Sequence, residues 1–230
     1  IAQGDTTTVL TAAIAAFYMG IPFGHVEAGL RTHDMKNPFP EEMNRVLVGK
    51  LAKWHFAPTH SAAENLLKEG IRESDITITE NTVIDSLLEV TASLERIDCK
   101  SVPNQRMILV TAHRRENFGA PMLEICAALR ELSIRFPDVI FRFPVHPNPN
   151  VTKVVYKELG ASPNVQLSSP LDYLSFVAAM RDAYFILTDS GGVQEEAPAL
   201  AKPVLVLREG TERPEAVQAG VVKVIGTHFD

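Results

Sequence analysis

The pairing of a small-residue turn with an acidic helix start is the most informative feature of the sequence. Asp189-Ser190-Gly191-Gly192 follows the apolar run Tyr184–Leu187, and a helical pattern begins at Val193. Two glycines let the backbone approach a ligand closely, and N–H groups at a helix start suit a phosphate. Glu196, one turn further on, could accept hydrogen bonds from sugar hydroxyls. The alternative is an ordinary turn capped by Ser190 or Asp189, with glutamates that favour the helix dipole.

A cluster of basic groups follows a second apolar run. His113, Arg114 and Arg115 come soon after Met107–Thr111. Open α/β sheets bind ligands at the carboxyl ends of their strands. Arginine presents a planar fork to phosphate oxygens, and histidine can donate a proton to a leaving phosphate, so this cluster favours a diphosphate. The alternative is a solvated loop in which Glu116 pairs with an arginine.

Two further strand ends carry a basic residue. His146 follows Val139–Pro144 in a loop that prolines make rigid. A single histidine is more often structural than catalytic, so both readings of His146 stay open. Arg213 follows Val204–Leu207, and it could either reach a phosphate or stay in solvent.

Three carboxylates in the first part of the chain could handle protons. Asp5, Glu27 and Glu41 each follow an expected strand or open an expected helix. Asp5 is also a good helix N-cap, and Glu41 is also a good partner for a helix dipole. All three would nevertheless project from one edge of one sheet. Carboxylates that share a cleft can have their pKa values separated, which yields an acid and a base for removing a proton from carbon.

The motifs of several other classes are absent from the sequence. No Gly-x-Gly-x-x-Gly follows a strand and no P-loop is present, so a bound dinucleotide or a P-loop ATPase is not expected. The histidines lack the spacing of metal ligands, and no Gly-x-Ser-x-Gly elbow occurs. We therefore expect neither a cofactor nor a metal.

The composition is that of a globular protein. The chain has 230 residues, of which 46% are hydrophobic and 22% charged, and this excludes intrinsic disorder. A net charge of −6 without a basic run argues against nucleic-acid binding. No apolar run is long enough for a membrane span, and the start does not resemble a signal peptide. Two unclustered cysteines, Cys99 and Cys126, fit a reducing compartment, so we expect a cytoplasmic protein.

Short strands alternate with helices along the whole sequence, which predicts an α/β fold with parallel sheets. The expected strands are Phe23–Val26, Trp54–Phe56, Ile76–Thr79, Met107–Thr111, Val139–Pro144, Val165–Leu167, Tyr184–Leu187, Val204–Leu207 and Val221–Ile225. The expected helices are Thr7–Tyr18, Glu41–Lys53, Ser61–Lys68, Ile84–Ser93, Pro121–Phe136, Pro149–Leu159, Leu171–Met180, Val193–Leu200 and Pro214–Ala219.

Helix ends and domain limits can also be read from the pattern. Ser61 and Glu64 have the spacing of a capping box, and four glycines are expected in a left-handed conformation after helices: Gly20, Gly70, Gly160 and Gly220. We expect two βαβ domains, at residues 1–80 and 81–230. The first has about three strands and only a remnant of a leading strand, so we expect the chain to be a piece of a longer protein.

Eight segments resemble, in order, those of the non-hydrolysing UDP-N-acetylglucosamine 2-epimerase family. They are Gly4–Thr8, His25–Arg31, Pro40–Arg45, Asn81–Asp85, His113–Glu116, Pro144–Asn150, Asp189–Pro198 and Thr211–Glu215. The sequence departs from the family at Gln3, where a histidine is usual, and at Glu80, where a glycine is usual. It also lacks the family's first strand and its Gly-Thr-Arg-Pro-Glu motif, and it ends before the family's last helix.

The resemblance implies two Rossmann-like domains of the B-type glycosyltransferase architecture, the first of them incomplete, facing each other across a cleft. The implied reaction interconverts UDP-N-acetylglucosamine and UDP-N-acetylmannosamine without NAD or metal, through elimination of UDP to a bound glycal and its re-addition. The resemblance assigns proton transfer to Asp5, Glu27 and Glu41, and leaving-group assistance to His113. The implied substrate-binding residues are Ser190, Gly191 and Gly192 for phosphate, Glu196 for the ribose hydroxyls, and Arg213 and Phe176 for the nucleotide.

The resemblance also implies a homodimer that serves cell-envelope polysaccharide synthesis, and a second substrate site near Glu42, Arg114 and His146. We expect this 230-residue piece to be inactive alone. Three alternatives remain: a UDP-sugar glycosyltransferase of the same architecture, a hydrolysing 2-epimerase and a non-catalytic nucleotide-sugar sensor. Incorporation of solvent deuterium at C2 separates the epimerase from a transferase, and product analysis separates it from a hydrolase.

Overall fold

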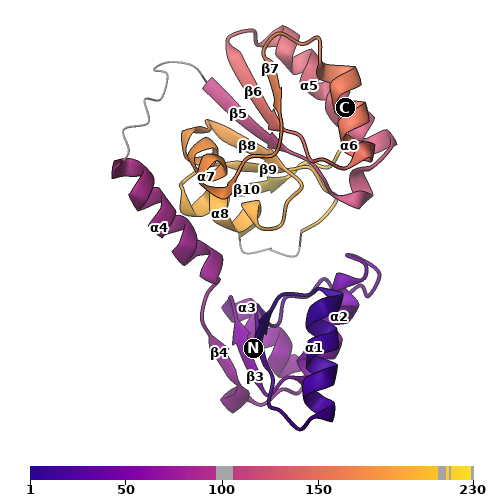
Figure 1. Ribbon diagram of the computed structural model, residues 1–230, viewed down its shortest axis with the longest axis vertical. Helices are drawn as coiled ribbons and strands as arrows, with labels where there is room; N and C mark the ends of the chain where they lie inside the picture. Colours follow the sequence, from indigo (N-terminus) through magenta and orange to yellow (C-terminus); the bar gives the residue numbers. More distant parts are fainter. Residues whose placement is uncertain (97–105, 212–215, 218, 229–230) are drawn as a thin grey trace. The chain divides into compact units, whose positions relative to one another are not determined.

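The protein consists of two compact units, Ile1–Val83 and Ile84–Asp230 (Figure 1). The computed structural model describes residues 1–96, 106–211, 216–217 and 219–228. Each unit is built around its own parallel sheet, so the predicted α/β class is confirmed. No helix within the described ranges is both long enough and apolar enough to cross a lipid bilayer.

The first unit is a four-stranded sheet with the order β1-β2-β3-β4. Its elements are β1 (Ala2–Gln3), α1 (Thr7–Tyr18), β2 (Gly24–Val26), α2 (Glu41–Leu51), β3 (Trp54–Ala57), α3 (His60–Lys68), a 3-10 turn (Glu73–Asp75) and β4 (Ile76–Ile78). Each strand pairs in parallel with the next strand of the sequence. Such a one-directional progression is half of a doubly wound sheet, as expected for an incomplete first domain.

The second unit contains a six-stranded sheet, within the described residues, with the order β10-β9-β8-β5-β6-β7. Its elements are α4 (Thr82–Arg96), β5 (Arg106–Thr111), a 3-10 turn (Arg115–Asn117), α5 (Ala120–Arg135), β6 (Val139–Pro144), α6 (Pro149–Leu159), β7 (Val165–Ser168), α7 (Tyr173–Asp182), β8 (Phe185–Thr188), α8 (Val193–Ala199), β9 (Val204–Val206) and β10 (Val222–Val224). Because the order reverses at β5 and β8, a crevice is expected at their carboxyl ends.

The central strands of the second unit are mostly apolar because helices cover both faces of the sheet. Ile108 and Val110 of β5 pack into a cluster with α5 and α6, which includes Met122 and Val155. Leu109, between them, packs into the opposite cluster. Successive side chains of a strand point to opposite faces, so one continuous apolar run supplies both cores.

Several helix ends differ from the sequence predictions. Thr59, and not Ser61, caps α3, because its hydroxyl accepts from the N–H of Ala62 at 3.0 Å. Asp172 caps α7 in the same way, so this helix begins after the predicted Leu171. The helix predicted at residues 214–219 falls partly outside the described residues.

The predicted left-handed conformation is present at Gly20, Gly70 and Gly220, but not at Gly160. Gly160 has a φ of −61° and continues the right-handed turn of α6. A Cβ there would lie 2.5 Å from the carbonyl oxygen of Tyr156. Close backbone approach, and not a positive φ, therefore requires this glycine.

A buried histidine links the first two strands. His25 on β2 is 1% exposed, and its Nε2 donates to the carbonyl oxygen of Gly4 at 2.8 Å. Its Nδ1 has no hydrogen-bond partner among the described residues. Burial lowers the pKa of His25 to about 4, and it also lowers the pKa of His55, the residue paired with His25 on β3. Both rings are therefore held in the neutral form.

We predict that acid destabilises the first unit between about pH 6.5 and pH 4. In this range the unfolded chain protonates His25 and the folded chain does not, so stability falls as the pH falls, by up to about 3 kcal/mol. Urea unfolding followed by the fluorescence of Trp54, the single tryptophan of the sequence, measures this slope. His25→Gln should flatten it, whereas the same change at the exposed His60 should leave it unaltered.

Candidate functional site

Asp5 and Glu27 lie at the carboxyl ends of two neighbouring strands, β1 and β2. Gly4, with a φ of +87°, turns the chain after β1, and its N–H donates to the carbonyl oxygen of Val26 at 3.0 Å. A Cβ on Gly4 would lie 3.7 Å from Oε2 of Glu27, so the glutamate side chain lies over this turn. Glu27 itself has a φ of +65°, which non-glycine residues rarely adopt. The structure therefore brings together two of the three predicted proton-handling groups.

Asp5 does not cap α1. Thr6 caps this helix, because its hydroxyl accepts from the N–H of Val9. Oδ2 of Asp5 instead accepts from Arg45, with Nε at 2.9 Å and Nη2 at 2.8 Å. Asn44 donates to the backbone carbonyl of Asp5 at 2.7 Å. Two residues of α2 thus hold Asp5, and the structure does not support the alternative reading of Asp5 as a simple N-cap.

Glu42 is a buried structural carboxylate. It is 1% exposed, and its Oε2 accepts from Nη1 of Arg45 at 2.9 Å. Its Oε1 accepts from the backbone N–H groups of Thr32 and His33, each at 3.0 Å. Both oxygens are therefore used inside the first unit. Glu41, the first residue of α2, is only half-buried.

A pocket of about 540 Å³ lies in the second unit, at the carboxyl ends of β5, β6 and β8. It brings together six residues that the sequence singled out, namely His113, His146, Phe176, Ser190, Gly192 and Glu196. Gly191 is buried next to this set and Arg114 does not line the pocket. Arg213 lies outside the described residues. The pocket occupies the crevice that the sheet order predicts.

Asp189, whose role the sequence reasoning missed, anchors the loop after β5. It is fully buried, and its Oδ2 accepts from the backbone N–H groups of His113 at 2.8 Å and Arg114 at 2.9 Å. Asn117 donates to the same oxygen at 3.0 Å. Asp189 is therefore not a helix cap. The signal in the sequence was an acid directly after a buried strand.

His113 lies between this carboxylate and a second histidine. Its ring stacks on that of His146, with centroids 5.5 Å apart and planes 20° apart. Burial lowers the pKa of His113, and the charge of Asp189 opposes this effect. The ring is half-exposed, lines the pocket and can exchange a proton with a bound group.

Ser190 and Gly192 of the glycine turn, with Glu196, form another part of the pocket wall. Gly192 precedes α8 without a side-chain cap, and a Cβ at this position would meet no atom within 4 Å. Glu196 is 7% exposed and accepts from the hydroxyl of Tyr173 at 3.4 Å. Burial raises the pKa of Glu196. This wall offers an open backbone turn beside a carboxylate that can accept hydroxyl hydrogen bonds.

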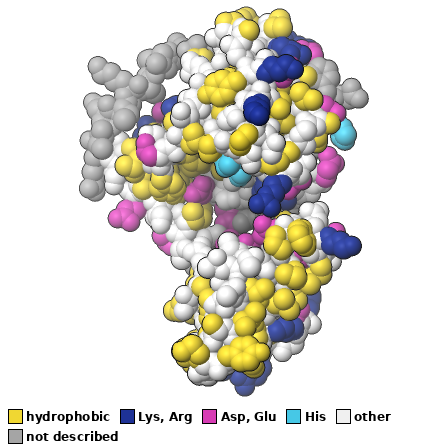
Figure 2. Space-filling view, turned by 45° about the vertical axis from the view of Figure 1, so that its right-hand side comes forward, with side chains coloured by type: hydrophobic (Ala, Val, Ile, Leu, Met, Phe, Trp, Pro, Cys, Tyr) yellow, Lys and Arg dark blue, Asp and Glu magenta, His cyan; other side chains and the backbone are white. Residues whose placement is uncertain are grey.

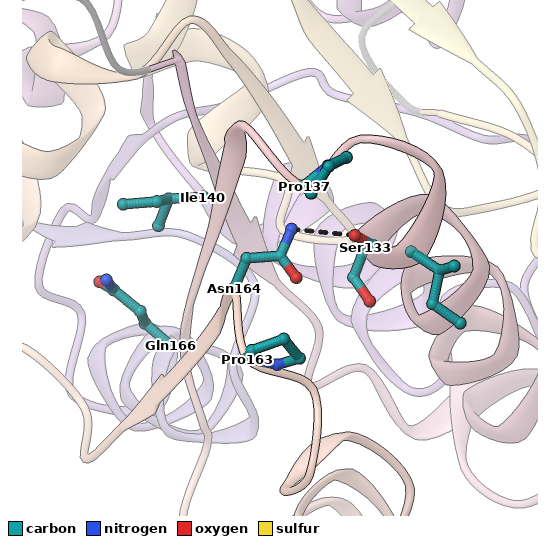
Figure 3. A pocket seen from close by; sticks show the side chains of 7 residues that line it. Ser133, Pro137, Ile140, Pro163, Asn164 and Gln166 are labelled. Carbon is teal, nitrogen blue, oxygen red and sulfur yellow. Dashed lines mark hydrogen bonds between the residues drawn. The ribbon is translucent and has the colours of Figure 1, made fainter.

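A second cavity, of about 450 Å³, lies at the amino ends of β6 and β7 (Figure 3). Asn164 points towards Ser133 there and donates to the carbonyl oxygens of Ser133, Phe136 and Val139. The residues around it carry no ionisable side chain. This arrangement closes the end of α5 and offers no group for acid–base chemistry.

Among the described residues, no group of three His, Cys, Asp or Glu side chains could hold a metal ion.

The comparisons with known proteins agree with one another over the whole chain. The family model described as UDP-N-acetylglucosamine 2-epimerase matches residues 1–230. The UDP-N-acetylglucosamine 2-epimerase of Escherichia coli K12 is 52% identical over 98% of this chain and 62% of its own length, and that of Yersinia pestis is 51% identical over 99% and 63%.

Solved structures give the same result. The UDP-GlcNAc 2-epimerase of Neisseria meningitidis bound to UDP-GlcNAc matches with a TM-score of 0.94 and 47% identity, over 99% of this chain and 64% of that one. The Methanocaldococcus jannaschii enzyme in complex with UDP-GlcNAc and UDP matches with a TM-score of 0.87 and 38% identity, over 99% and 64%. The chain thus spans less than two thirds of the length of these relatives. It belongs to the UDP-N-acetylglucosamine 2-epimerase family.

Proposed function

We propose that the protein carrying this chain interconverts UDP-N-acetylglucosamine and UDP-N-acetylmannosamine. The observation that carries the proposal is the pocket at the β5–β8 switch point, which combines His113, the Ser190–Gly192 turn and Glu196. Family membership supports it, and solved relatives hold UDP-GlcNAc and UDP. The names of these relatives favour the epimerase over the glycosyltransferase, hydrolase and sensor alternatives.

In this proposal the second unit binds the nucleotide diphosphate. The backbone of Ser190, Gly191 and Gly192 holds phosphate oxygens, since the glycine turn leaves room for them. Glu196 accepts from the ribose hydroxyls, and Phe176 with Arg213 contacts the nucleotide. His113 gives a proton to the departing diphosphate and takes it back on re-addition.

The carboxylates of the first unit perform the proton transfers at carbon. One of Asp5, Glu27 and Glu41 removes the proton from C2 while the C1–O bond to UDP breaks, which leaves a glycal with a C1–C2 double bond. A proton then returns to C2 from the other face, and UDP re-forms the bond at C1. Arg45 keeps Asp5 in place as an acceptor. The assignment of Glu42, Arg114 and His146 to a second substrate site stays a prediction. Both carboxylate oxygens of Glu42 already accept hydrogen bonds inside the first unit, which argues against a role for Glu42 in such a site.

We predict that the full-length protein, incubated with UDP-N-acetylglucosamine in D₂O, incorporates deuterium at C2 of both nucleotide sugars. Elimination and re-addition exchange the C2 proton with solvent-derived protons, and sugar transfer does not. Proton NMR of the recovered nucleotide sugars measures the exchange. Glu27→Gln should reduce its rate by about 10²-fold or more. Release of free N-acetylmannosamine, or turnover without deuterium, would contradict the proposal.

We predict that Glu196→Gln weakens the binding of UDP about tenfold. A hydrogen bond to a charged group contributes about 1.5–3 kcal/mol, and the amide keeps only one acceptor oxygen. Isothermal titration calorimetry with UDP measures the change. Glu195→Gln is the matched control, because Glu195 is on the same helix but does not line the pocket. Equal losses in the two variants would remove Glu196 from the nucleotide site.

We extend the proposal to a cytoplasmic homodimer that supplies cell-envelope polysaccharide synthesis. Hydrophobic side chains are exposed on the first unit (Figure 2). Phe17, Tyr18 and Met19 at the end of α1 are 64%, 84% and 72% exposed, and patches of this kind mark protein contacts. The buried, unpaired Cys126 supports a reducing compartment.

We predict that Phe17→Glu with Tyr18→Lys converts the full-length dimer to a monomer, because charges disfavour burial in an apolar contact. Light scattering after size-exclusion chromatography measures the mass. The same pair of changes at the exposed Leu123 and Ile134 of α5 is the control and should leave the mass unaltered. A wild-type monomer at micromolar concentration would contradict the dimer.

A further inference from the structure

One oxygen of the buried Asp189 lacks a donor. Three N–H donors converge on Oδ2, whereas Oδ1 is buried and makes no hydrogen bond within the part of the chain that the structure describes. Nδ1 of His113 lies 3.3 Å from Oδ1. A buried acceptor without a partner destabilises a protein by about 1–3 kcal/mol. The anchoring of the loop uses Oδ2 alone, so it does not explain why Oδ1 faces a histidine ring.

The state of the histidine ring decides whether Oδ1 is satisfied. Burial favours the neutral form of His113, which carries one proton on either Nδ1 or Nε2. A proton on Nδ1 donates to Oδ1 after a small rotation of the ring, and catalytic hydrogen bonds are often long without a ligand. A proton on Nε2 would instead set the lone pair of Nδ1 against a carboxylate oxygen. The stacked ring of His146 restricts the plane of His113 in either case.

We infer that Asp189 is a positioning residue that keeps His113 in the Nδ1–H tautomer and presents Nε2 as the atom that exchanges a proton with a diphosphate. The diphosphate in this inference rests on the proposed function. Nε2 takes its proton from solvent before the diphosphate departs, and the imidazolium then lies beside the carboxylate of Asp189. The Nε2 proton passes to the phosphate oxygen as the C1–O bond breaks. It returns to Nε2 as that bond re-forms.

The tautomer can be measured without any activity assay. ¹⁵N NMR of the intact, histidine-labelled protein at neutral pH separates protonated from unprotonated ring nitrogens, and His113→Asn assigns the signals. We expect a protonated Nδ1 and an unprotonated Nε2 in His113. A proton on Nε2 in the wild-type protein would overturn the inference, whether or not any variant folds.

Asp189→Asn tests whether Asp189 determines the tautomer of His113. The amide oxygen can still accept from the three N–H donors, and its NH₂ group then faces Nδ1 and forces the Nε2–H tautomer. We expect this switch together with a fall in kcat of about 10²-fold or more and little change in KM. An unchanged tautomer in folded Asp189→Asn would overturn the inference. A switched tautomer with unchanged kcat would support the positioning by Asp189 and contradict the proposed role of His113 in catalysis.

Asn117→Ala distinguishes the positioning of the His113 ring from the anchoring of the loop after β5. It removes one donor from Oδ2 and leaves Oδ1 and the ring of His113 in place. We expect a lower thermal unfolding midpoint with the wild-type tautomer of His113. A tautomer change in this variant would show that loop anchoring alone controls the ring, and it would overturn the inference.

Discussion

The second unit depends on one buried carboxylate at the point where the order of its strands reverses, between β8 and β5. Asp189 follows β8, and the loop that carries His113 follows the neighbouring β5. Parallel strands end at the same edge, so a side chain from one strand end can bind the backbone of the next. Without Asp189, the N–H groups of His113 and Arg114 would be left without this acceptor, and the wall of the pocket would lose its fixed position. Stability and site geometry therefore rest on the same contact.

The first unit uses a comparable device with the opposite charge at its centre. Arg45 is 5% exposed and joins Asp5 to Glu42, which in turn holds the backbone at Thr32 and His33. A buried guanidinium needs such partners, because an unpaired buried charge is strongly unfavourable. As a consequence, Arg45 holds Oδ2 of Asp5 towards α2. Glu27 differs in its backbone, which has the rare positive φ of 65° directly after β2.

Sequence patterns predicted the elements better than their ends. Pro149–Leu159 was predicted with the observed bounds because apolar spacing and a proline at its start agree. The cap of α3 was assigned to the wrong residue, and Asp5 does not cap α1 although its residue type allows it, since Asp5 and Thr6, or Thr59 and Ser61, are equally suitable by residue type. In the first pair, Arg45, 40 residues away in the sequence, takes the carboxylate that would otherwise cap the helix.

The sequence by itself determined the fold class, the family and six of the residues that line the pocket, because each depends on local patterns: apolar runs, glycine turns and short motifs in order. Only the tertiary structure decided which donors each carboxylate meets. Asp5, Glu42 and Asp189 all carry a carboxylate. The role of each is determined by hydrogen-bond donors that come from other segments of the chain. A carboxylate acquires its role from the N–H groups that surround it, and those are brought to it by the packing of strands and helices.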